Sequence, residues 1–213
     1  MRVCVVTGGA LDRDLLLSLD LKNRWDRILG VDRGAQFLAE LGLWPDLVLG
    51  DLDSAEPSAV RALEEKGLEF LRFPPEKDLT DTHLALEHCR DMGATEVLVL
   101  GATGNRLDHM FANLFLGFRY RKDFTCVFRD PWNEVHPLEG PGTFQFEASE
   151  FPYLSILPVS DTARVLEVSG VRYPLGERLL ERSDSLGISN EVLGTKATLR
   201  LGEGKVLVFR SKD

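Results

Sequence analysis

Two aspartates that directly follow an apolar run could hold a cation together. The run Leu47–Leu49 leads into Gly50-Asp51-Leu52-Asp53-Ser54. Side chains alternate between the faces of an extended chain, so Asp51 and Asp53 would point the same way, about 6 to 7 Å apart. If the two carboxylates relaxed to about 4 Å from each other without a cation between them, their charges would repel by roughly 4 kcal/mol at an effective dielectric of about 20. Magnesium, which prefers hard oxygen ligands, would remove this repulsion; a solvated acidic turn is the alternative.

The elements that must position these residues alternate between strand and helix as far as about residue 130. This pattern predicts parallel strands joined by crossover helices. The predicted strands are Val3–Thr7, Arg27–Asp32, Asp46–Gly50, Glu69–Phe73, Glu96–Gly101 and Thr125–Arg129. Helices are predicted at 57–66 and 80–92, and also where apolar residues recur at helical spacing, namely Leu107, Met110, Phe111, Leu114 and Phe118. We expect this last stripe to pack on the sheet as core.

A second kind of sequence begins after about residue 130, where prolines and glycines interrupt the alternation. The candidate strands are Phe144–Phe146, Tyr153–Pro158, Arg164–Val168, Leu186–Ser189, Ala197–Leu201 and Val206–Phe209. Strict alternation over 196–201 indicates a half-buried antiparallel strand, and Gly202-Glu203-Gly204 predicts a hairpin between the last two strands. The predicted architecture is an α/β N-terminal domain with a mostly parallel sheet, residues 1–130, followed by an all-β, sandwich-like C-terminal domain, residues 131–213.

Composition excludes several classes of function. The 213-residue chain has a net charge of −9 and no cluster of Lys and Arg, which argues against a nucleic-acid binder. Cys4, Cys89 and Cys126 are widely spaced in apolar contexts, which favours reduced core thiols over disulfides or a zinc site. The first residues hold too short an apolar run for a signal peptide or a membrane span. We therefore expect a cytoplasmic protein that does not contact membranes.

The predicted strand ends are rich in glycine or acidic residues, and ligands of open α/β sheets bind beyond such ends. The blocks are Thr7-Gly8-Gly9-Ala10, Asp32-Arg33-Gly34-Ala35, Gly50–Ser54, Lys77-Asp78-Leu79-Thr80-Asp81 and Gly101–His109. Glycines and helix N-termini suit phosphate oxygens, Arg106 offers a planar fork, and acids beside an anion need a metal. Together the blocks predict a site for a nucleotide polyphosphate with magnesium, contacted by Thr7, Gly8, Gly9, Asp32, Lys77, Thr80, Gly101 and Arg106.

Each block alone has a simpler interpretation. Thr80 or Asp81 could only cap the helix that follows, and Asp108 could only complement the dipole in the first turn of its own helix. His83 and His109 lie in amphipathic helices, where a single histidine is more often a packing residue than a ligand. The Gly8-Gly9 pair lacks the full G-x-G-x-x-G pattern and is weak evidence by itself.

In combination, the blocks resemble those of the thiamine pyrophosphokinase family. Four match in order: Asp32–Ala35, Gly50–Ser54, Lys77–Asp81 and Gly101–His109, and the C-terminal half adds Gly170–Leu175 and Gly187–Glu191. The resemblance implies a homodimer that transfers the diphosphate of ATP to the hydroxyl of thiamine and releases AMP. It departs at Leu52, where the family commonly has Phe, and at Gly104-Asn105, where the family commonly has two glycines.

The resemblance also implies roles for single residues. Asp51, Asp53 and Asp81 would hold magnesium, while Thr80, Arg106 and Asp108 would position phosphates and the attacking hydroxyl, with Asp32 beside them. Tyr173 would stack on the thiamine pyrimidine, and Ser189 and Asn190 would line the same pocket from the partner subunit. Without the resemblance, Tyr173 would be predicted to be a core aromatic at a strand end.

Three other functions stay open at this point. A diphosphokinase that acts on a pterin alcohol shares part of the acidic pattern, and a nucleotide-sugar glycosyltransferase also uses two aspartates in this spacing to hold a metal. A non-catalytic nucleotide sensor would bind ATP without forming AMP. Whether Asp81 or Asp108 accepts the proton from the acceptor hydroxyl also stays open.

Overall fold

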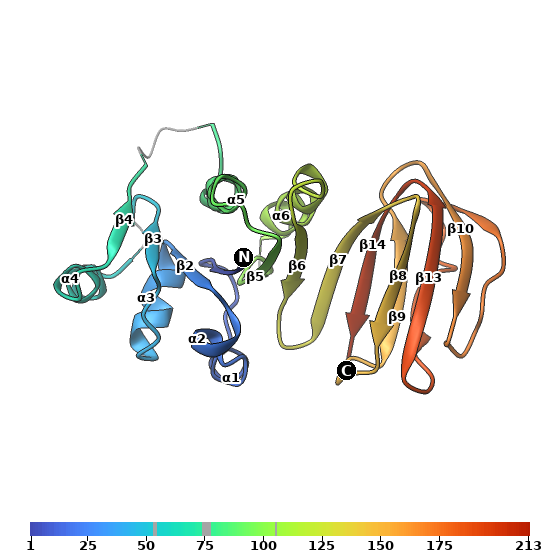
Figure 1. The fold of residues 1–213 in the computed structure, drawn as a ribbon, viewed down its shortest axis with the longest axis horizontal. Coiled ribbons are helices and arrows are strands. Elements are labelled where there is room, and N and C mark those ends of the chain that lie inside the picture. Colours follow the sequence, from blue (N-terminus) through green and yellow to red (C-terminus); the bar gives the residue numbers. More distant parts are fainter. Residues whose placement is uncertain (53–54, 74–77, 105) are drawn as a thin grey trace. The chain divides into compact units, whose positions relative to one another are not determined.

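The chain forms two compact units, Met1–Pro131 and Trp132–Asp213 (Figure 1). The computed structural model describes residues 1–52, 55–73, 78–104 and 106–213.

A parallel sheet organises the first unit. Its strands are β1 (Arg2–Val6), β2 (Arg27–Val31), β3 (Leu47–Leu49), β4 (Glu69–Leu71), β5 (Glu96–Leu100) and β6 (Thr125–Arg129). They pair in the order β6-β5-β1-β2-β3-β4, and each neighbouring pair is parallel. The predicted parallel strands are confirmed, but most end one or two residues early. Thr7, Asp32, Gly50 and Gly101 therefore lie just beyond the strands.

Helices cover both faces of this sheet (Figure 1). They are α1 (Arg13–Ser18), α2 (Leu21–Arg24), α3 (Arg33–Glu40), α4 (Pro57–Glu65), α5 (Asp81–Asp91) and α6 (Leu107–Arg119). On one face Leu16, Leu21 and Leu38 from α1, α2 and α3 pack against alternate residues of β1, β2 and β5. Leu63 of α4 packs beside Ala35 of α3. On the other face, α5 and α6 cover the sheet, and burial of their apolar residues fixes them there.

The apolar stripe of α6 is only partly core, which corrects the prediction. Leu114 is 2% exposed, but Leu107 and Phe111 are 62% and 50% exposed. The reason is a polar anchor: the buried Asn113 amide donates a hydrogen bond of 3.1 Å to the carbonyl oxygen of Ala102. This bond sets the rotation of α6 about its axis and leaves Leu107 and Phe111 facing outward.

The three cysteines are core thiols, as predicted. Cys4, Cys89 and Cys126 are buried and none is in a disulfide. Burial raises the pKa of Cys89 to about 12 and raises the pKa of Cys4 and Cys126 as well, so all three thiols are neutral at physiological pH. Within the part of the chain that the structure describes, no helix is long and apolar enough to cross a membrane.

The second unit is an antiparallel β-sandwich, as predicted. Its strands are β7 (Asn133–Glu139), β8 (Gly142–Glu147), β9 (Tyr153–Pro158), β10 (Thr162–Ser169), β11 (Arg178–Glu181), β12 (Asn190–Glu191), β13 (Lys196–Glu203) and β14 (Lys205–Ser211). One sheet has the order β12-β9-β14-β7 and the other β11-β10-β13-β8. Ala197, Leu199 and Leu201 of β13 are buried, which confirms the predicted alternation. They meet Ile156, Val206 and Val208 of the facing sheet in one apolar core.

Three details of this unit differ from the predictions. β13 and β14 are joined at Gly204 but pair with different strands, so the chain steps from one sheet to the other and the predicted hairpin is wrong. The segment Leu186–Ser189 is not a strand; Leu186 and Ile188 are exposed. β7, β11 and β12 were not predicted, and β7 contains Pro137, a residue that ordinarily argues against a strand.

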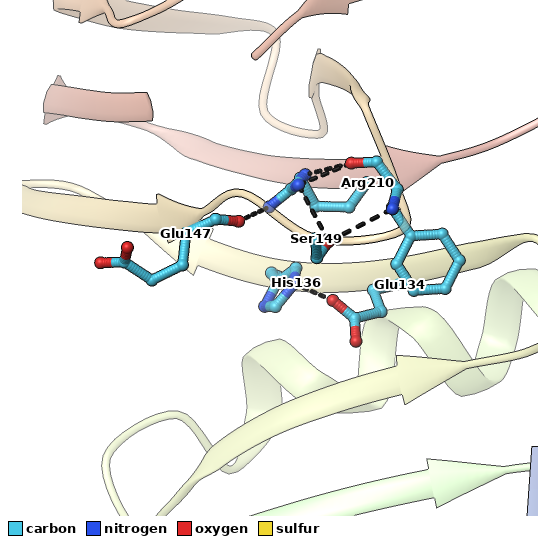
Figure 2. Close-up of polar contacts among 6 residues, drawn as sticks. Glu134, His136, Glu147, Ser149 and Arg210 are labelled. Carbon is cyan, nitrogen blue, oxygen red and sulfur yellow. Dashed lines mark hydrogen bonds and ion pairs between the residues drawn. The ribbon is translucent and has the colours of Figure 1, made fainter. Parts of the chain in front are cut away.

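A buried arginine ties the segment between β8 and β9 to the sandwich (Figure 2). Arg210 of β14 is 3% exposed, and its guanidinium donates to the carbonyl oxygens of Glu147 (3.0 Å) and Phe151 (3.1 Å) and to Oγ of Ser149 (3.1 Å). Desolvation lowers the pKa of Arg210, and the negative charge of Glu134 opposes this shift. The hydrogen bonds compensate the buried charge, and through them Arg210 joins the segment between β8 and β9 to β14.

Candidate functional site

Two loops at the carboxyl ends of adjacent strands are fastened together by main-chain hydrogen bonds. The N–H of Thr7, after β1, donates to the carbonyl oxygen of Leu100 at 2.8 Å, and the N–H of Gly9 donates to that of Gly101 at 2.9 Å. The N–H of Ala10 donates to the carbonyl oxygen of Thr103 at 2.8 Å. These bonds continue the pairing of β1 with β5 past the end of the sheet. They make the two loops one rigid edge.

Glycine is required at position 9 because the two loops approach so closely. A Cβ built on Gly9 would lie 2.1 Å from the carbonyl oxygen of Gly101 and 2.5 Å from that of Thr103. Both are main-chain atoms that cannot move aside locally. The Gly9 and Ala10 N–H groups donate to these carbonyl oxygens, and a contact of the glycine-rich loop with phosphate stays a prediction. Glycine at position 9 therefore allows the loop after β1 to pack closely against the loop after β5.

The strand order places a ligand site at this edge. From β1 the chain adds β2, β3 and β4 in one direction and then returns to add β5 and β6 on the other side of β1. The order therefore reverses between β1 and β5. In open α/β sheets the crevice beyond the carboxyl ends of the strands at such a reversal is where ligands bind.

A cavity of about 660 Å³ opens at this point, within the size range of small-molecule sites. The described residues that were predicted to contact the nucleotide all line it, together with Asp81, which was predicted to hold magnesium. They are Thr7, Gly8, Gly9, Asp32, Thr80, Gly101 and Arg106. These residues come from the ends of β1, β2 and β5 and from the N-termini of α5 and α6. The structure thus gathers residues up to a hundred positions apart into one site.

Other predicted residues are not part of this lining. Asp51 and Asp108 are not among the described residues that line the cavity. Asp53 and Lys77 lie outside the described residues, so their predicted roles stay predictions. Asp51 is the second residue after β3, a strand that lies two positions away from β1 in the sheet.

Asp32 is held at the cavity by an unusual main-chain conformation. Its φ and ψ are 47° and −121°, a region that non-glycine residues rarely adopt and that costs about 1–3 kcal/mol. Its N–H donates to the carbonyl oxygen of Leu49 at 3.0 Å, and its Oδ1 lies 3.4 Å from the N–H of Leu52. A Cβ on Gly50, whose φ is +122°, would lie 1.8 Å from this Oδ1. Glycine at position 50 therefore leaves the space that the carboxylate of Asp32 occupies.

The N-terminus of α5 combines a helix cap with a cavity wall. Oγ1 of Thr80 accepts a hydrogen bond of 3.2 Å from the N–H of His83, so Thr80 is the N-cap. Thr80 and Asp81 both line the cavity. The capping interpretation and the site interpretation are thus compatible, and the positive end of the helix dipole faces the cavity.

Arg106 and Asp108 form an exposed ion pair at the start of α6. Nη2 of Arg106 lies 2.7 Å from Oδ2 of Asp108, and Nε lies 3.3 Å from Oδ1. The hydrogen bond from Arg106 lowers the pKa of Asp108, and the same bond raises the pKa of Arg106. A solvent-exposed pair of this kind contributes little to stability. The guanidinium can therefore exchange its carboxylate for a phosphate at small cost.

Four further residues that the sequence interpretation gave no role in the site also line the cavity: Arg33, Thr82, His109 and Asn113. His109 and Asn113 follow Arg106 by three and seven positions, so they share one face of α6. That spacing was visible in the sequence and identifies both residues once Arg106 is placed in the site. We predicted that His109 was a packing residue, whereas it lies at the cavity wall.

The donor set of the cavity is chemically suited to magnesium. Asp32, Asp81 and the hydroxyl of Thr80 offer hard oxygens in one cavity, and magnesium is usually bound by one or two carboxylates together with substrate phosphates. Among the described residues, no group of three His, Cys, Asp or Glu side chains is close enough to hold a metal alone. A metal here would take the rest of its coordination from substrate and water.

The predicted acceptor residues lie close together in the second unit. The amide of Asn190 accepts a hydrogen bond from the N–H of Tyr173 at 3.0 Å and donates one to its carbonyl oxygen at 2.8 Å. The N–H of Ser189, a residue with φ +55°, donates to Oγ of Ser155 at 2.9 Å. The Tyr173 side chain is 67% exposed, so the prediction of a core aromatic from the sequence pattern alone is wrong. Leu186 and Ile188 are exposed apolar neighbours in the sequence.

Comparisons with known proteins agree across both units. The family profile "Thiamin pyrophosphokinase, catalytic domain" matches residues 19–128, and the profile "Thiamin pyrophosphokinase, vitamin B1 binding domain" matches residues 143–206. Thiamine pyrophosphokinase of Bacillus subtilis is 29% identical over 98% of both chains. The crystal structure of the B. subtilis enzyme superimposes with a TM-score of 0.89 at 27% identity and covers both chains fully. That of Geobacillus thermodenitrificans thiamin pyrophosphokinase gives 0.88 at 32% identity, covering 100% of this chain and 98% of the other.

Proposed function

Because this chain belongs to the thiamin pyrophosphokinase family, we propose that it transfers the diphosphate group of ATP to the hydroxyl of thiamine. The products are thiamine diphosphate and AMP. The observation that carries this proposal is the cavity at the β1–β5 reversal. It combines two carboxylates, the Thr80 N-cap and the Arg106 guanidinium. This set of groups suits a phosphate chain with its metal.

The reaction exchanges one phosphorus–oxygen bond for another. The hydroxyl oxygen of thiamine bonds to the β-phosphorus of ATP, and the bond from that phosphorus to the α,β-bridging oxygen breaks. AMP leaves with the bridging oxygen, and the hydroxyl proton is released to a carboxylate or to water. The protein contributes mainly position and charge, as in other phosphoryl transfers.

As the resemblance implies, magnesium would be held by Asp51, Asp53 and Asp81, with Asp32 and Thr80 as further oxygen donors in the cavity. When bound it would neutralise charge on the transferred group. The chain's own groups act around it. Arg106 would release Asp108 and donate to a phosphate as a planar fork. Thr80 and the N-terminus of α5 would present their partial positive charge to the same phosphates, and Asp32 would orient beside them.

Asp81 is the better candidate for the proton acceptor. Asp108 does not belong to the described cavity lining. Asp81 lines the cavity from the first turn of α5. With a loose transition state, a weak base is sufficient.

Thiamine would be bound through the second unit. The exposed ring of Tyr173 would stack on the pyrimidine, and Ser189 and Asn190 would line the same pocket. The two hydrogen bonds between Asn190 and the main chain of Tyr173 hold this aromatic in place without burying it. We further propose a cytoplasmic homodimer in which the acceptor residues come from the partner subunit.

One assay separates this function from its rivals. The purified chain is incubated with ATP and magnesium, with and without thiamine, and AMP is quantified by chromatography. We expect AMP in proportion to thiamine diphosphate, and only when thiamine is present. Nucleoside diphosphate from a nucleotide sugar would support a glycosyltransferase, AMP formed only with a pterin alcohol would support that acceptor, and ATP binding without AMP would support a sensor.

A further inference from the structure

The segment that follows β5 is held in place at each of its first three residues. The carbonyl oxygens of Gly101 and Thr103 accept main-chain hydrogen bonds from the loop after β1. Between them, the carbonyl oxygen of Ala102 accepts the hydrogen bond from the side chain of Asn113. All three residues of the segment line the cavity. This part of the cavity wall is therefore fixed from two directions, by the loop after β1 and by α6.

A third tie reaches the same segment from the end of β6. Oγ1 of Thr103 donates a hydrogen bond of 3.1 Å to Oδ2 of Asp130, the residue that directly follows β6. β5 and β6 are parallel neighbours whose last residues, Leu100 and Arg129, lie opposite each other. Both partners of the bond thus lie just beyond the same edge of the sheet. The two side chains are partly buried, which reduces competition from water.

Asp130 lies outside the described lining of the cavity, whereas Thr103 belongs to it. A hydroxyl has one proton to donate, and that of Thr103 is directed to Asp130, away from a ligand. Asp130 can therefore influence the cavity in two ways, by holding Thr103 or by the field of its charge. The two ways have opposite consequences. Loss of the tie would loosen the segment, while loss of a negative charge would favour a bound phosphate.

We propose that Asp130 is a positioning residue, which acts through Thr103 on the segment after β5. This role rests on the proposed function, because the segment matters for turnover only if the cavity is where phosphate is transferred. Arg106, the N-cap of α6, follows the segment closely and lines the same cavity. Movement of the segment would displace such groups, and an error of about 1 Å in position can cost about 100-fold in rate.

Steady-state kinetics of the full chain test the tie from both of its ends. Thr103→Val removes the donor at nearly constant volume, and Asp130→Ala removes the acceptor. We expect each variant to lose about ten-fold in kcat/KM for ATP, with the KM for thiamine unchanged. The double variant should lose no more than either single variant, because both substitutions break the same bond.

Conservative variants should restore the activity. Asp130→Asn keeps an acceptor oxygen, and Thr103→Ser keeps the hydroxyl donor. Each should stay within about two-fold of the unaltered chain in kcat/KM for ATP. A role of the charge alone predicts a different pattern, in which Asp130→Asn and Asp130→Ala change kcat/KM alike and Thr103→Val changes nothing.

Matched controls lie at the other end of the same two strands. Oγ1 of Thr125 donates to the carbonyl oxygen of Thr95 at 3.3 Å, so Thr125→Val removes a hydrogen bond of the same kind. Asp123→Ala removes an exposed carboxylate just before β6. Neither substituted residue lines the cavity, and both variants should keep the kcat/KM of the unaltered chain. Unfolding midpoints verify that all variants fold.

Amide hydrogen exchange, followed by mass spectrometry, tests the tie without relying on turnover. The N–H groups of Gly9 and Ala10 donate to the segment after β5, so their exchange reports how firmly the segment is held. In Asp130→Ala and in Thr103→Val, peptides that contain these two amides should exchange about five-fold faster or more. Peptides from β2 should exchange as in the unaltered chain.

Three results would overturn the inference. The first is exchange and kcat/KM in Asp130→Ala that equal those of the unaltered chain. The second is a double variant whose loss is the product of the two single losses, since the two residues would then act independently. The third is the pattern expected for charge alone. Failure of the proposed function is a separate result: AMP would not form with thiamine in the unaltered chain, and the exchange measurement would still decide whether Asp130 holds the segment.

Discussion

The strand ends of the α/β unit and the strands of the β-sandwich are built by different rules. In β13 of the sandwich, buried and solvent-facing side chains alternate, and the buried ones are Ala197, Leu199 and Leu201. At the strand ends of the α/β unit, Asp32 and Leu52 have positive φ of 47° and 59°. The sandwich strands follow an alternation of buried and exposed side chains. The edge that lines the cavity instead contains unusual main-chain conformations, which apolar packing holds in place. Substitutions should therefore affect turnover in one region and stability in the other.

Asp81→Asn should have the largest effect and should spare stability. The substitution removes a negative charge from the cavity, where charge arrangement supplies most of the rate, so we expect turnover to fall by about 100-fold or more. Steady-state AMP formation measures it. The control is Asp91→Asn at the other end of α5, where Asp91 pairs with Arg90 on the surface. Comparable losses in both variants would contradict the separation between site and scaffold.

Arg210→Met should have the next largest effect, on stability. The carbonyl oxygens of Glu147 and Phe151 would lose their buried donor, at a cost of about 2–3 kcal/mol in free energy of unfolding. Chemical denaturation measures the change. Arg200→Met is the control, since Arg200 makes a surface ion pair with Glu167 and should leave the midpoint nearly unchanged. If the two variants unfold alike, the buried network does not hold the β8–β9 segment.

Tyr173→Ala should sharpen the comparison, because it tests a site residue that lies within the sandwich unit. Its exposed ring contributes no core packing, so we expect normal stability and a KM for thiamine raised about five- to ten-fold through loss of stacking. The KM for ATP should not change. Leu179→Ala, at another exposed apolar residue of the same unit, provides the control. An unchanged KM for thiamine would place the acceptor elsewhere.

The smallest effect should be the pH response of the Arg106–Asp108 pair. Because Arg106 lowers the pKa of Asp108, the pair's small contribution to stability is complete above the ordinary carboxyl pKa of about 3.9. It is lost as the pH falls through the lowered value. A carboxyl titration followed by NMR should give the lowered pKa, and Arg106→Gln should raise it toward the ordinary value. No change in Arg106→Gln would mean that the two groups do not interact in solution.

The parallel sheet and most of the cavity lining could be predicted from the sequence, because the apolar runs mark the strands and the cavity residues follow directly after them. Thr7, Asp32 and Gly101 were identified by position after apolar runs, and the fold brings such positions together whatever their separation. The local sequence pattern around Asp51 could not show that this residue is not among the described residues that line the cavity. That outcome depends on strand order, which places β3 two strands from β1.

The remaining errors arise where tertiary contacts override a local rule. The buried hydrogen bond of Asn113 sets the rotation of α6 and exposes Leu107 and Phe111. Gly204 allows a tight turn, as a hairpin would require, but β13 before it and β14 after it pair with strands of different sheets. Pro137 occurs inside β7, where the proline-based rule predicted a break. In each case a distant partner decides between two locally acceptable conformations.

The fastening of the β1 loop to the β5 loop has a consequence for how the cavity could change over time. The bonds join main-chain atoms only, so exchanging side chains elsewhere leaves this frame intact. Thr80, Asp81 and Arg106 line the cavity from other segments, at the N-termini of α5 and α6. Directed evolution could thus exchange these side chains one at a time without loosening the frame that supports them.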